Sequence, residues 1–98
     1  MPKITREVRV LNELGLHLRP AGMLVNVANR YKSEIMLEKD GEKINAKSIM
    51  GVMMLGAEPN SILIISAEGE DAEAAVAAIE QLFTTAFDEQ ADQKGEGI

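Results

Sequence analysis

Apolar and polar residues alternate in four stretches of the chain, and this alternation predicts four β-strands. The stretches lie at residues 4–11, 35–37, 44–46 and 61–66. The pair Asp40-Gly41 stands between the second and the third stretch. Asp-Gly between two alternating runs is a strong hairpin signal, because both residues accept the positive φ angles of a tight turn. We therefore expect the two middle strands to form an antiparallel hairpin.

Apolar residues recur at helical spacing in two longer segments and in one short one. Residues 18–31 carry apolar side chains at the i, i+3, i+4 and i+7 positions, which predicts an amphipathic helix. Residues 48–54 begin with a serine and are otherwise apolar or glycine, which predicts a helix of about one to two turns. A last helix is expected to follow Asp71 as its N-cap. Its apolar face comprises Ala75, Val76, Ile79, Leu82, Phe83 and Ala86.

The predicted elements follow one another in the order β-α-β-β-α-β-α. This order indicates an α+β fold in which helices cover one face of a four-stranded sheet and solvent covers the other. The chain has 98 residues, enough for one hydrophobic core and too few for two. We expect the domain to span residues 1–87. Residues 88–98 are polar and contain glycine, which predicts a disordered tail.

The composition argues against several classes of protein. The chain has no cysteine, so it needs no disulfide and fits a reducing compartment, which favours the cytoplasm. Its net charge of −6 argues against a nucleic-acid binder. No apolar run reaches the roughly 20 residues that span a bilayer, and the N-terminus shows no signal peptide, so no membrane insertion is expected. Three of the six net negative charges come from the tail: Asp88, Glu89, Asp92 and Glu96 against Lys94.

His17 is the only histidine in the chain, and it stands directly before the first predicted helix. At a helix start the N–H groups of Leu18 and Arg19 precede the first intrahelical hydrogen bond and carry a partial positive charge, which favours phosphate binding. Arg19 adds a planar set of donors suited to phosphoryl oxygens, and Pro20 is tolerated in a first turn. His17 is therefore a candidate phosphate acceptor. A lone histidine can equally be a surface or capping residue, and the residues alone leave both roles open.

Ser48 and the apolar residues after it form a second candidate site. A serine before a helix usually acts only as the N-cap, which stabilises the helix by about 1 kcal/mol. A phosphate is also tolerated at this position, so a regulatory role stays open. The short helix carries five large apolar residues: Ile49, Met50, Val52, Met53 and Met54. A helix this short cannot bury them all, and we expect some to form an adaptable docking surface.

The small number of metal-ligating residues argues against a metal site. Methionine thioethers beside one histidine could suggest copper(I), but the chain offers no cysteine and no second imidazole. We therefore expect no metal site and no cofactor.

Two motifs together carry a resemblance to a known family. The segments GLHLRPA at residues 15–21 and KSIMGVM at residues 47–53 closely resemble the HPr family, the histidine-containing phosphocarriers of the phosphoenolpyruvate-dependent sugar phosphotransferase system. Both motifs fall at the family's separation, and the resemblance covers residues 3–87. It implies an open-faced β-sandwich with a four-stranded antiparallel sheet, in agreement with the predicted order of elements.

The resemblance implies a phosphoryl carrier rather than a turnover enzyme. Members of the family accept a phosphoryl group from phosphorylated enzyme I on Nδ1 of the histidine that matches His17. They then pass the group to IIA proteins or domains. The arginine that matches Arg19 helps to hold the phosphoryl group, together with the backbone amides at Leu18 and Arg19.

The resemblance also implies regulation and docking. In many relatives the serine that matches Ser48 is phosphorylated by an ATP-dependent kinase, so a serine kinase/phosphorylase is an expected partner. The apolar patch around Ile49, Met50 and Met53 matches the surface that relatives present to their partners. We expect a cytoplasmic monomer that binds no nucleic acid.

Three features depart from the family pattern. Leu18 stands where most members have alanine, and its bulk beside His17 is expected to narrow the choice of partner. Gly22 lies inside the first predicted helix, at a cost of about 1 kcal/mol relative to alanine. The tail after residue 87 extends beyond the usual end of the domain.

Two other functions stay open at this point. The first is an HPr-like regulator that acts through protein contacts and phosphorylation of Ser48 without feeding sugar uptake. The second is a ligand-binding module of ferredoxin-like topology, which needs two long helices on one face of the sheet. The short second helix and the third helix after the last strand make this module the least favoured interpretation.

Overall fold

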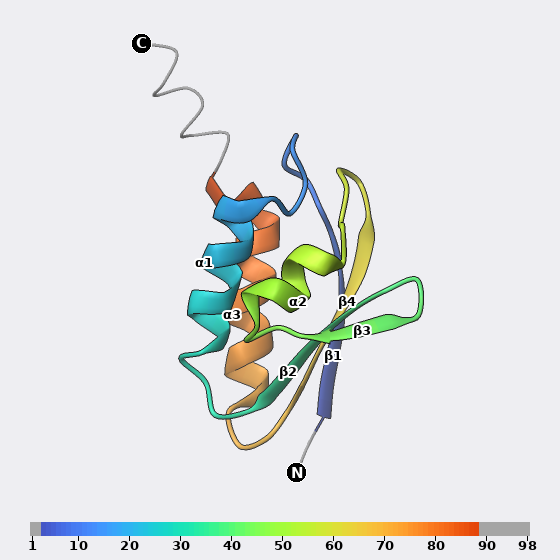
Figure 1. Cartoon of the computed structure of the whole chain (residues 1–98). Coiled ribbons are helices and arrows are strands. Elements are labelled where there is room, and N and C mark those ends of the chain that lie inside the picture. Colours follow the sequence, from blue (N-terminus) through green and yellow to red (C-terminus); the bar gives the residue numbers. More distant parts are fainter. Residues whose placement is uncertain (1–2, 89–98) are drawn as a thin grey trace.

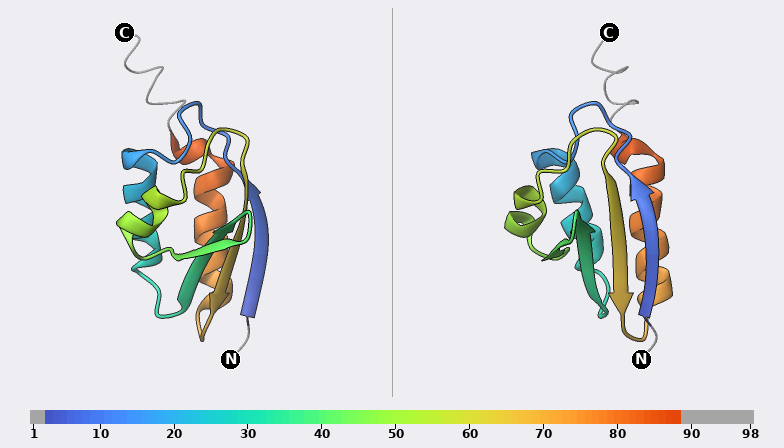
Figure 2. Two further views of the ribbon diagram at one scale, coloured as in Figure 1. Left: turned by 45° about the vertical axis from the view of Figure 1, so that its right-hand side comes forward. Right: turned by 90° about the vertical axis from the view of Figure 1, so that its right-hand side faces the viewer.

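The computed structural model describes residues 3–88, which form a four-stranded antiparallel sheet with helices on one side (Figure 1). The elements are β1 (Lys3–Arg9), α1 (Leu18–Ala28), β2 (Glu34–Lys39), β3 (Glu42–Asn45), α2 (Ile49–Met54), β4 (Ile62–Glu68), α3 (Ala72–Thr84) and the 3₁₀ helix η1 (Ala86–Asp88). The strands lie in the order β1-β4-β2-β3. In the right-hand view of Figure 2 the strands lie in front of α1 and α3, so these helices cover the far face of the sheet. The predicted α+β, open-faced β-sandwich is confirmed.

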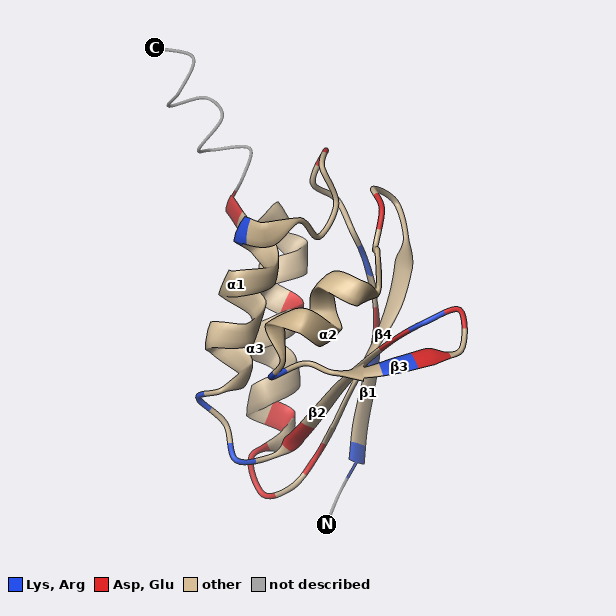
Figure 3. Ribbon diagram, viewed as in Figure 1, with Lys and Arg blue, Asp and Glu red and all other residues tan. Residues whose placement is uncertain are grey.

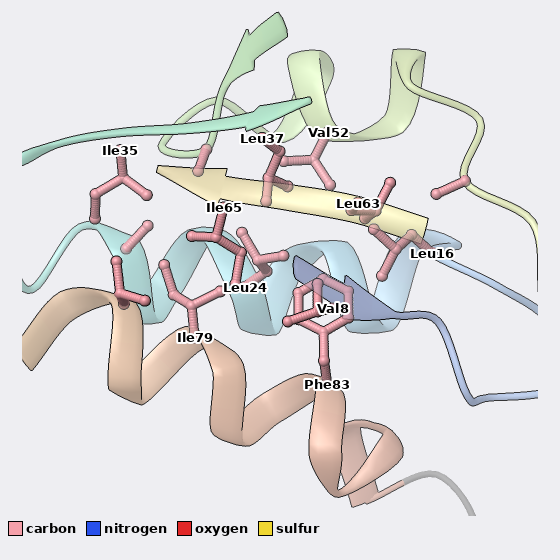
Figure 4. Packing of buried hydrophobic residues seen from close by; sticks show 14 of the residues in the cluster. Val8, Leu16, Leu24, Ile35, Leu37, Val52, Leu63, Ile65, Ile79 and Phe83 are labelled. Atoms are coloured by element: carbon pink, nitrogen blue, oxygen red, sulfur yellow. The ribbon is translucent and has the colours of Figure 1, made fainter. Parts of the chain in front are cut away.

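The alternation along the strands sorts side chains between the two faces of the sheet. In β4, Leu63 and Ile65 are fully buried, whereas Ile62 and Ile64 are 39% and 40% exposed. The buried side chains pack beneath the helices, and the exposed ones lie on the open face. Figure 4 shows the core that they form with side chains from the other elements, among them Val8, Leu24, Leu37, Ile79 and Phe83.

The predicted hairpin is confirmed. β2 and β3 pair in antiparallel register up to Lys39 and Glu42. Between these residues lie Asp40 at φ 52° and Gly41 at φ 84°. The two consecutive positive φ angles are those that the Asp-Gly pair predicted from the sequence.

β1 ends at Arg9, before the predicted end at residue 11. Pairing nevertheless continues for one more residue outside the strand. The N–H group of Val10 donates to Ser61 O at 2.9 Å, and Asn60 N donates to Val10 O at 2.8 Å. Val10 is fully buried while Leu11 is 49% exposed, so the chain leaves the sheet at this point.

α1 ends at Ala28, before the predicted end at residue 31. The N–H groups of Arg30 and Tyr31 donate to carbonyls three residues back, at 3.0 and 3.2 Å, which tightens the chain into a 3₁₀-type turn. Asn29 reinforces the end of the helix, because its side-chain amide donates to Val25 O at 2.8 Å. Local hydrogen bonding by asparagine therefore overrides the apolar periodicity on which the prediction rested.

α3 begins after Asp71 as predicted, but within the described residues the Asp71 carboxylate makes no hydrogen bond that caps the helix. It accepts hydrogen bonds from the backbone N–H groups of Lys32 and Ser33, at 2.8 and 2.9 Å, and from Ser33 Oγ. These bonds, led by the one from Ser33 Oγ, lower the pKa of Asp71 to about 2. The prediction of a side-chain cap is wrong, since the carboxylate instead ties α3 to the loop before β2.

The C-terminal part of the described chain differs from the sequence prediction at two residues. Ala86, predicted on the apolar face of the last helix, lies in η1, because α3 ends at Thr84. Asp88, the first residue of the predicted tail, also belongs to η1. The rest of that tail, residues 89–98, lies outside the described residues. Among the helices that the structure describes, none has the length and apolar character needed to cross a membrane.

Candidate functional site

His17 occupies the N-cap of α1, as the sequence predicted. Its backbone is extended, with φ −81° and ψ −167°, and its carbonyl accepts an early hydrogen bond of the helix, from Ala21 N at 3.0 Å. Within residues 3–88 the imidazole makes no capping hydrogen bond to the first turn. The ring is half-buried and stands beside the positive end of the helix without serving as its cap.

A clasp between two loops fixes His17 in place. Leu16 is buried, and its N–H group donates to Ala57 O at 2.9 Å, in the loop between α2 and β4. The preceding residue, Gly15, has φ +69°, and a Cβ atom at this position would lie 2.4 Å from Ala57 O. The side-chain amide of Asn12, itself buried, donates to Gly15 O at 2.5 Å. Only glycine fits this close approach, so Gly15 and Ala57 are positioning residues for His17.

The sequence analysis included Gly15 in the motif around His17 without giving it a role of its own, and it did not single out Ala57. A glycine before His17 was a usable signal for a close approach of backbones. No local pattern marks Ala57, because its role depends on a contact across more than forty positions of the chain.

The first turn of α1 divides its side chains between core and solvent. Pro20 and Ala21 are buried, which anchors the turn, whereas Leu18 is 66% exposed and Arg19 is also exposed. Arg19 is the only charged residue in α1, and α2 has none (Figure 3). The start of α1 therefore carries the imidazole of His17, the first-turn amides and the side chain of Arg19 within three consecutive residues. This combination suits a phosphoryl group.

Ser48 occupies the N-cap of α2, as predicted, and here the side chain does cap the helix. Its Oγ accepts a hydrogen bond from Gly51 N at 3.1 Å. The residue before it ties this helix start to the end of α1, because Lys47 Nζ donates to Tyr31 O at 2.7 Å and Lys47 O accepts from the Asn29 amide at 3.3 Å. Ser48 is half-buried, so the fold holds this residue at the helix start without burying it completely.

α2 presents most of its apolar side chains to solvent. Val52 is fully buried, and the other four large residues form what we call the α2 surface. This surface comprises Ile49, Met50, Met53 and Met54, which are 43%, 69%, 40% and 71% exposed. The expectation that part of this segment faces outward is confirmed for four of its five large apolar residues. Met54, which sequence reasoning did not assign to docking, is the most exposed of the four.

The two candidate helix starts belong to neighbouring elements. α1 and α2 pack against each other (Figure 1), and a Cβ atom at Gly22 of α1 would lie 3.9 Å from Ile49 Cδ1 of α2. This distance is an ordinary contact, so the glycine is not required for the approach of the helices. The α2 surface and the start of α1 thus lie on one pair of packed helices that carries a single charge.

Comparison with known proteins identifies the family. Residues 4–85 match the family described as PTS HPr component phosphorylation site. The phosphocarrier protein HPr of Treponema pallidum is 48% identical over 87 residues, which cover 89% of this chain and 99% of the relative. The HPr-like protein Crh of Halalkalibacterium halodurans is 45% identical over 76 residues, 78% of this chain and 90% of the relative.

Comparison with solved structures supports the same family assignment. The crystal structure of a phosphocarrier protein HPr from Bacillus anthracis is similar with a TM-score of 0.80 at 42% identity, and the match covers 83% of this chain and 96% of that one. The family match over residues 4–85 includes both helix starts, and the similarity to HPr structures argues against the ligand-binding module. From residue 4 to residue 85, therefore, the chain belongs to the HPr family of the phosphotransferase system.

Proposed function

We propose that this protein is a phosphocarrier that accepts a phosphoryl group on His17 from phosphorylated enzyme I and passes it to IIA proteins or domains. The observation that carries the proposal is the position of His17 at the N-cap of α1, with an imidazole that does not cap the helix. Membership of the HPr family supports the same role. The protein acts as a cytoplasmic monomer, with no metal and no cofactor.

The groups around the imidazole of His17 explain how a phosphoryl group could be transferred to it. Nδ1 of the neutral imidazole attacks phosphorus, a new N–P bond forms, and the bond to the donor breaks with its electron pair leaving to the donor. Phosphoryl transfer mainly requires positioning and stabilisation of charge. The amides of Leu18 and Arg19 point from the positive helix end, and the Arg19 guanidinium supplies further donors. The helix dipole contributes about 0.3–1 kcal/mol to holding an exposed phosphoryl group.

Partners dock on the α2 surface. Ile49, Met50 and Met53 are exposed there, and flexible methionine side chains adapt to more than one partner. A carrier must release each partner after transfer, which a small apolar surface with few charges allows. Leu18, 66% exposed beside His17, adds apolar bulk that a partner has to accommodate, so it narrows partner choice.

Phosphorylation of Ser48 regulates the transfer. A phosphate on Oγ places about two negative charges at the edge of the α2 surface, where α1 and α2 otherwise carry no carboxylate. Docking of an acidic or apolar partner is then weakened by repulsion and desolvation. A second candidate function, an HPr-like regulator that does not feed sugar uptake, draws support from this capped serine and from the similarity to the HPr-like protein Crh.

Transfer from phosphorylated enzyme I tests the proposal. Wild type, His17→Ala, Ser48→Asp and the control Ser48→Ala are mixed with the phosphorylated donor, and the rate of phosphoryl acceptance is followed. We expect no acceptance by His17→Ala with an unchanged circular dichroism spectrum, and slower acceptance by Ser48→Asp than by Ser48→Ala. Unchanged acceptance by His17→Ala would refute the acceptor assignment. Equal rates for the two Ser48 variants would refute the regulatory role.

A further inference from the structure

The described part of the chain gathers its exposed sulfur atoms on α2. Met50 and Met54 are 69% and 71% exposed, and Met53 is 40% exposed. The two other methionines that the structure describes are half-buried: Met23 lies in α1 and packs against the core, and Met36 lies in β2. Among the described residues, the most accessible thioethers therefore belong to one helix of six residues.

Helical spacing explains why Met50 and Met54 are the most exposed. Residues four positions apart are neighbours on the same face of a helix, so these two methionines, which we call the α2 pair, share the outer face of α2. Val52 is fully buried and anchors the opposite face in the core. In the right-hand view of Figure 2, α2 lies at the outer edge of the molecule. The α2 pair therefore presents two neighbouring thioethers to solvent on a helix without a charged residue.

The composition makes thioethers the main targets of a mild oxidant. The chain has no cysteine and no tryptophan, so it lacks the other side chains that oxidants readily attack. A peroxide must reach a sulfur atom to oxidise it, and exposed thioethers therefore react before shielded ones. Within residues 3–88, the α2 pair is the first target that a peroxide in solution meets.

We propose that Met50 and Met54 are a reversible oxidation site, at which a hydroperoxide converts the α2 surface from apolar to polar. A lone pair of the thioether sulfur attacks one oxygen of the peroxide, an S–O bond forms and the O–O bond breaks. The electron pair of the broken bond leaves with the other oxygen, which takes up the proton of the attacked oxygen and departs as water or an alcohol. Sulfur is oxidised by two electrons and the peroxide is reduced. Methionine sulfoxide reductases restore the thioether.

Oxidation of the α2 pair changes the surface and leaves the core in place. A thioether packs as an apolar group, whereas a sulfoxide is polar and accepts hydrogen bonds. Because both side chains are mostly exposed, the packing of Val52 beneath them does not depend on their polarity. A partner that covers the α2 surface would have to bury two sulfoxide oxygens, which weakens its binding. This last consequence rests on the proposed function, while the oxidation itself does not.

Peptide masses after limited treatment with hydrogen peroxide test the selectivity. Trypsin cleaves after Lys47 and next after Lys94, so the methionines of α2 share a peptide that contains no other methionine. Met23 and Met36 fall in two other peptides, and fragmentation of the α2 peptide assigns each added oxygen to one sulfur. We expect the α2 pair to be oxidised about three- to tenfold faster than Met23 and Met36. Equal rates at all these positions overturn the proposal.

Hydrophobic-interaction chromatography of the folded protein tests the change of the surface without any partner. Oxidised wild type should elute earlier than the untreated protein with an unchanged circular dichroism spectrum, and treatment with the reductases should restore its retention. The variant Met50→Leu/Met54→Leu keeps two apolar side chains and lacks both sulfurs, so peroxide should shift its retention much less. The matched control Met23→Leu/Met36→Leu keeps the α2 pair and should shift as the wild type does. Equal shifts in the two variants overturn the proposal.

Binding and transfer distinguish the failure of this proposal from the failure of the proposed function. Each protein is compared with its own untreated sample, so the effects of the substitutions cancel. Oxidised wild type should bind enzyme I about three- to tenfold more weakly, and Met50→Leu/Met54→Leu should lose little affinity on the same treatment. Unchanged binding and phosphoryl acceptance by oxidised wild type overturn the effect on docking and leave the carrier function standing. Absence of acceptance by the untreated protein refutes the carrier function, while peptide masses and retention still decide on the oxidation site.

Discussion

α1 and α2 pack against each other, and the N-cap residue of each helix is one that we propose is phosphorylated. The two N-caps nevertheless differ in their hydrogen bonds. Ser48 caps its own helix, because its Oγ accepts the hydrogen bond from Gly51 N. The imidazole of His17 does not cap α1, and a clasp through Gly15 and Ala57 fixes the residue from outside the helix. Phosphorylation of His17 would therefore disturb no helix cap, whereas phosphorylation of Ser48 would alter the group that stabilises its helix.

This contrast fits a division of tasks. A carrier site is loaded and emptied in each cycle, so the fold should not depend on whether the phosphate is present. A regulatory site has the opposite requirement, because its phosphate must change a surface that partners contact. The α2 surface begins directly after Ser48, with Ile49, so a phosphate on Ser48 would change the surface on which we propose that partners dock.

The largest effect is expected from breaking the clasp behind His17. In Gly15→Ala the new Cβ atom would lie 2.4 Å from Ala57 O at a φ of +69°, so steric overlap adds to backbone strain. We expect a loss of about 3 kcal/mol in the free energy of unfolding, measured by chemical denaturation. The matched control is Gly56→Ala, at φ +59° with no atom within 4 Å, which carries the strain alone and should lose about 1–2 kcal/mol. Equal losses in the two variants would mean that the clasp does not constrain the loop.

A smaller effect is expected at the second helix, where one residue anchors α2 and another faces solvent. Val52→Ala removes a fully buried side chain and should lower the free energy of unfolding by roughly 2 kcal/mol. Met54→Ala, at 71% exposure, should change it by less than about 0.5 kcal/mol and should weaken binding to enzyme I. The pair is compared by denaturation and by titration with the partner. A large loss of stability in Met54→Ala would contradict the assignment of this residue to docking.

The comparison of the two helix starts is sharpened by removing each N-cap side chain. Ser48→Ala deletes a cap and should lower the free energy of unfolding by about 1 kcal/mol. His17→Ala deletes a side chain that does not cap and should alter it by less than about 0.5 kcal/mol. Thermal or chemical denaturation of both variants in one buffer checks this. If His17→Ala were the more destabilised of the two, the proposed division of tasks would be wrong.

The smallest expected effect is on the free energy of unfolding at acidic pH, and it arises from Asp71 at the start of α3. The Asp71 pKa of about 2 lies below its ordinary value of 3.8, chiefly because Ser33 Oγ donates to the carboxylate. The ionised carboxylate therefore stabilises the folded protein fully above pH 4 to 5, and this contribution is lost as the pH falls through about 2. The difference in unfolding free energy between wild type and Asp71→Asn should be constant near neutral pH and shrink toward pH 2. A difference that stays the same across this range would contradict the lowered pKa of Asp71. The variant Ser33→Ala, which removes the main hydrogen-bond donor to this carboxylate, should raise the Asp71 pKa.

Local sequence patterns predicted most of the helices, strands and turns, because these elements depend on interactions between residues close together in the chain. The Asp40-Gly41 turn depends on two residues that accept positive φ angles, and the cap at Ser48 depends on an amide three residues away. His17 could be assigned to a helix start for the same reason. The element order then limited the sheet to a small number of topologies.

The features that sequence reasoning missed depend on contacts between distant parts of the chain. Gly15 meets Ala57, and the Asp71 carboxylate meets Ser33, 38 positions earlier in the chain. The aspartate was expected to cap its own helix, since that is the common local use of this residue. Its real partners could be identified only once the loop before β2 was placed against α3. The same holds for the exposure of Met54, which depends on which face of α2 packs on α1.

The central claim is that His17 carries the phosphoryl group, and the mass of the intact protein tests it most directly. The wild type is incubated with enzyme I, magnesium and phosphoenolpyruvate, and its mass is measured before and after mild acid treatment. The account predicts the addition of one phosphoryl group that acid removes, as expected for a phosphohistidine, in the only histidine of the chain. No added mass on the folded protein, while a known HPr is phosphorylated in parallel, or an added mass that survives acid, would contradict it.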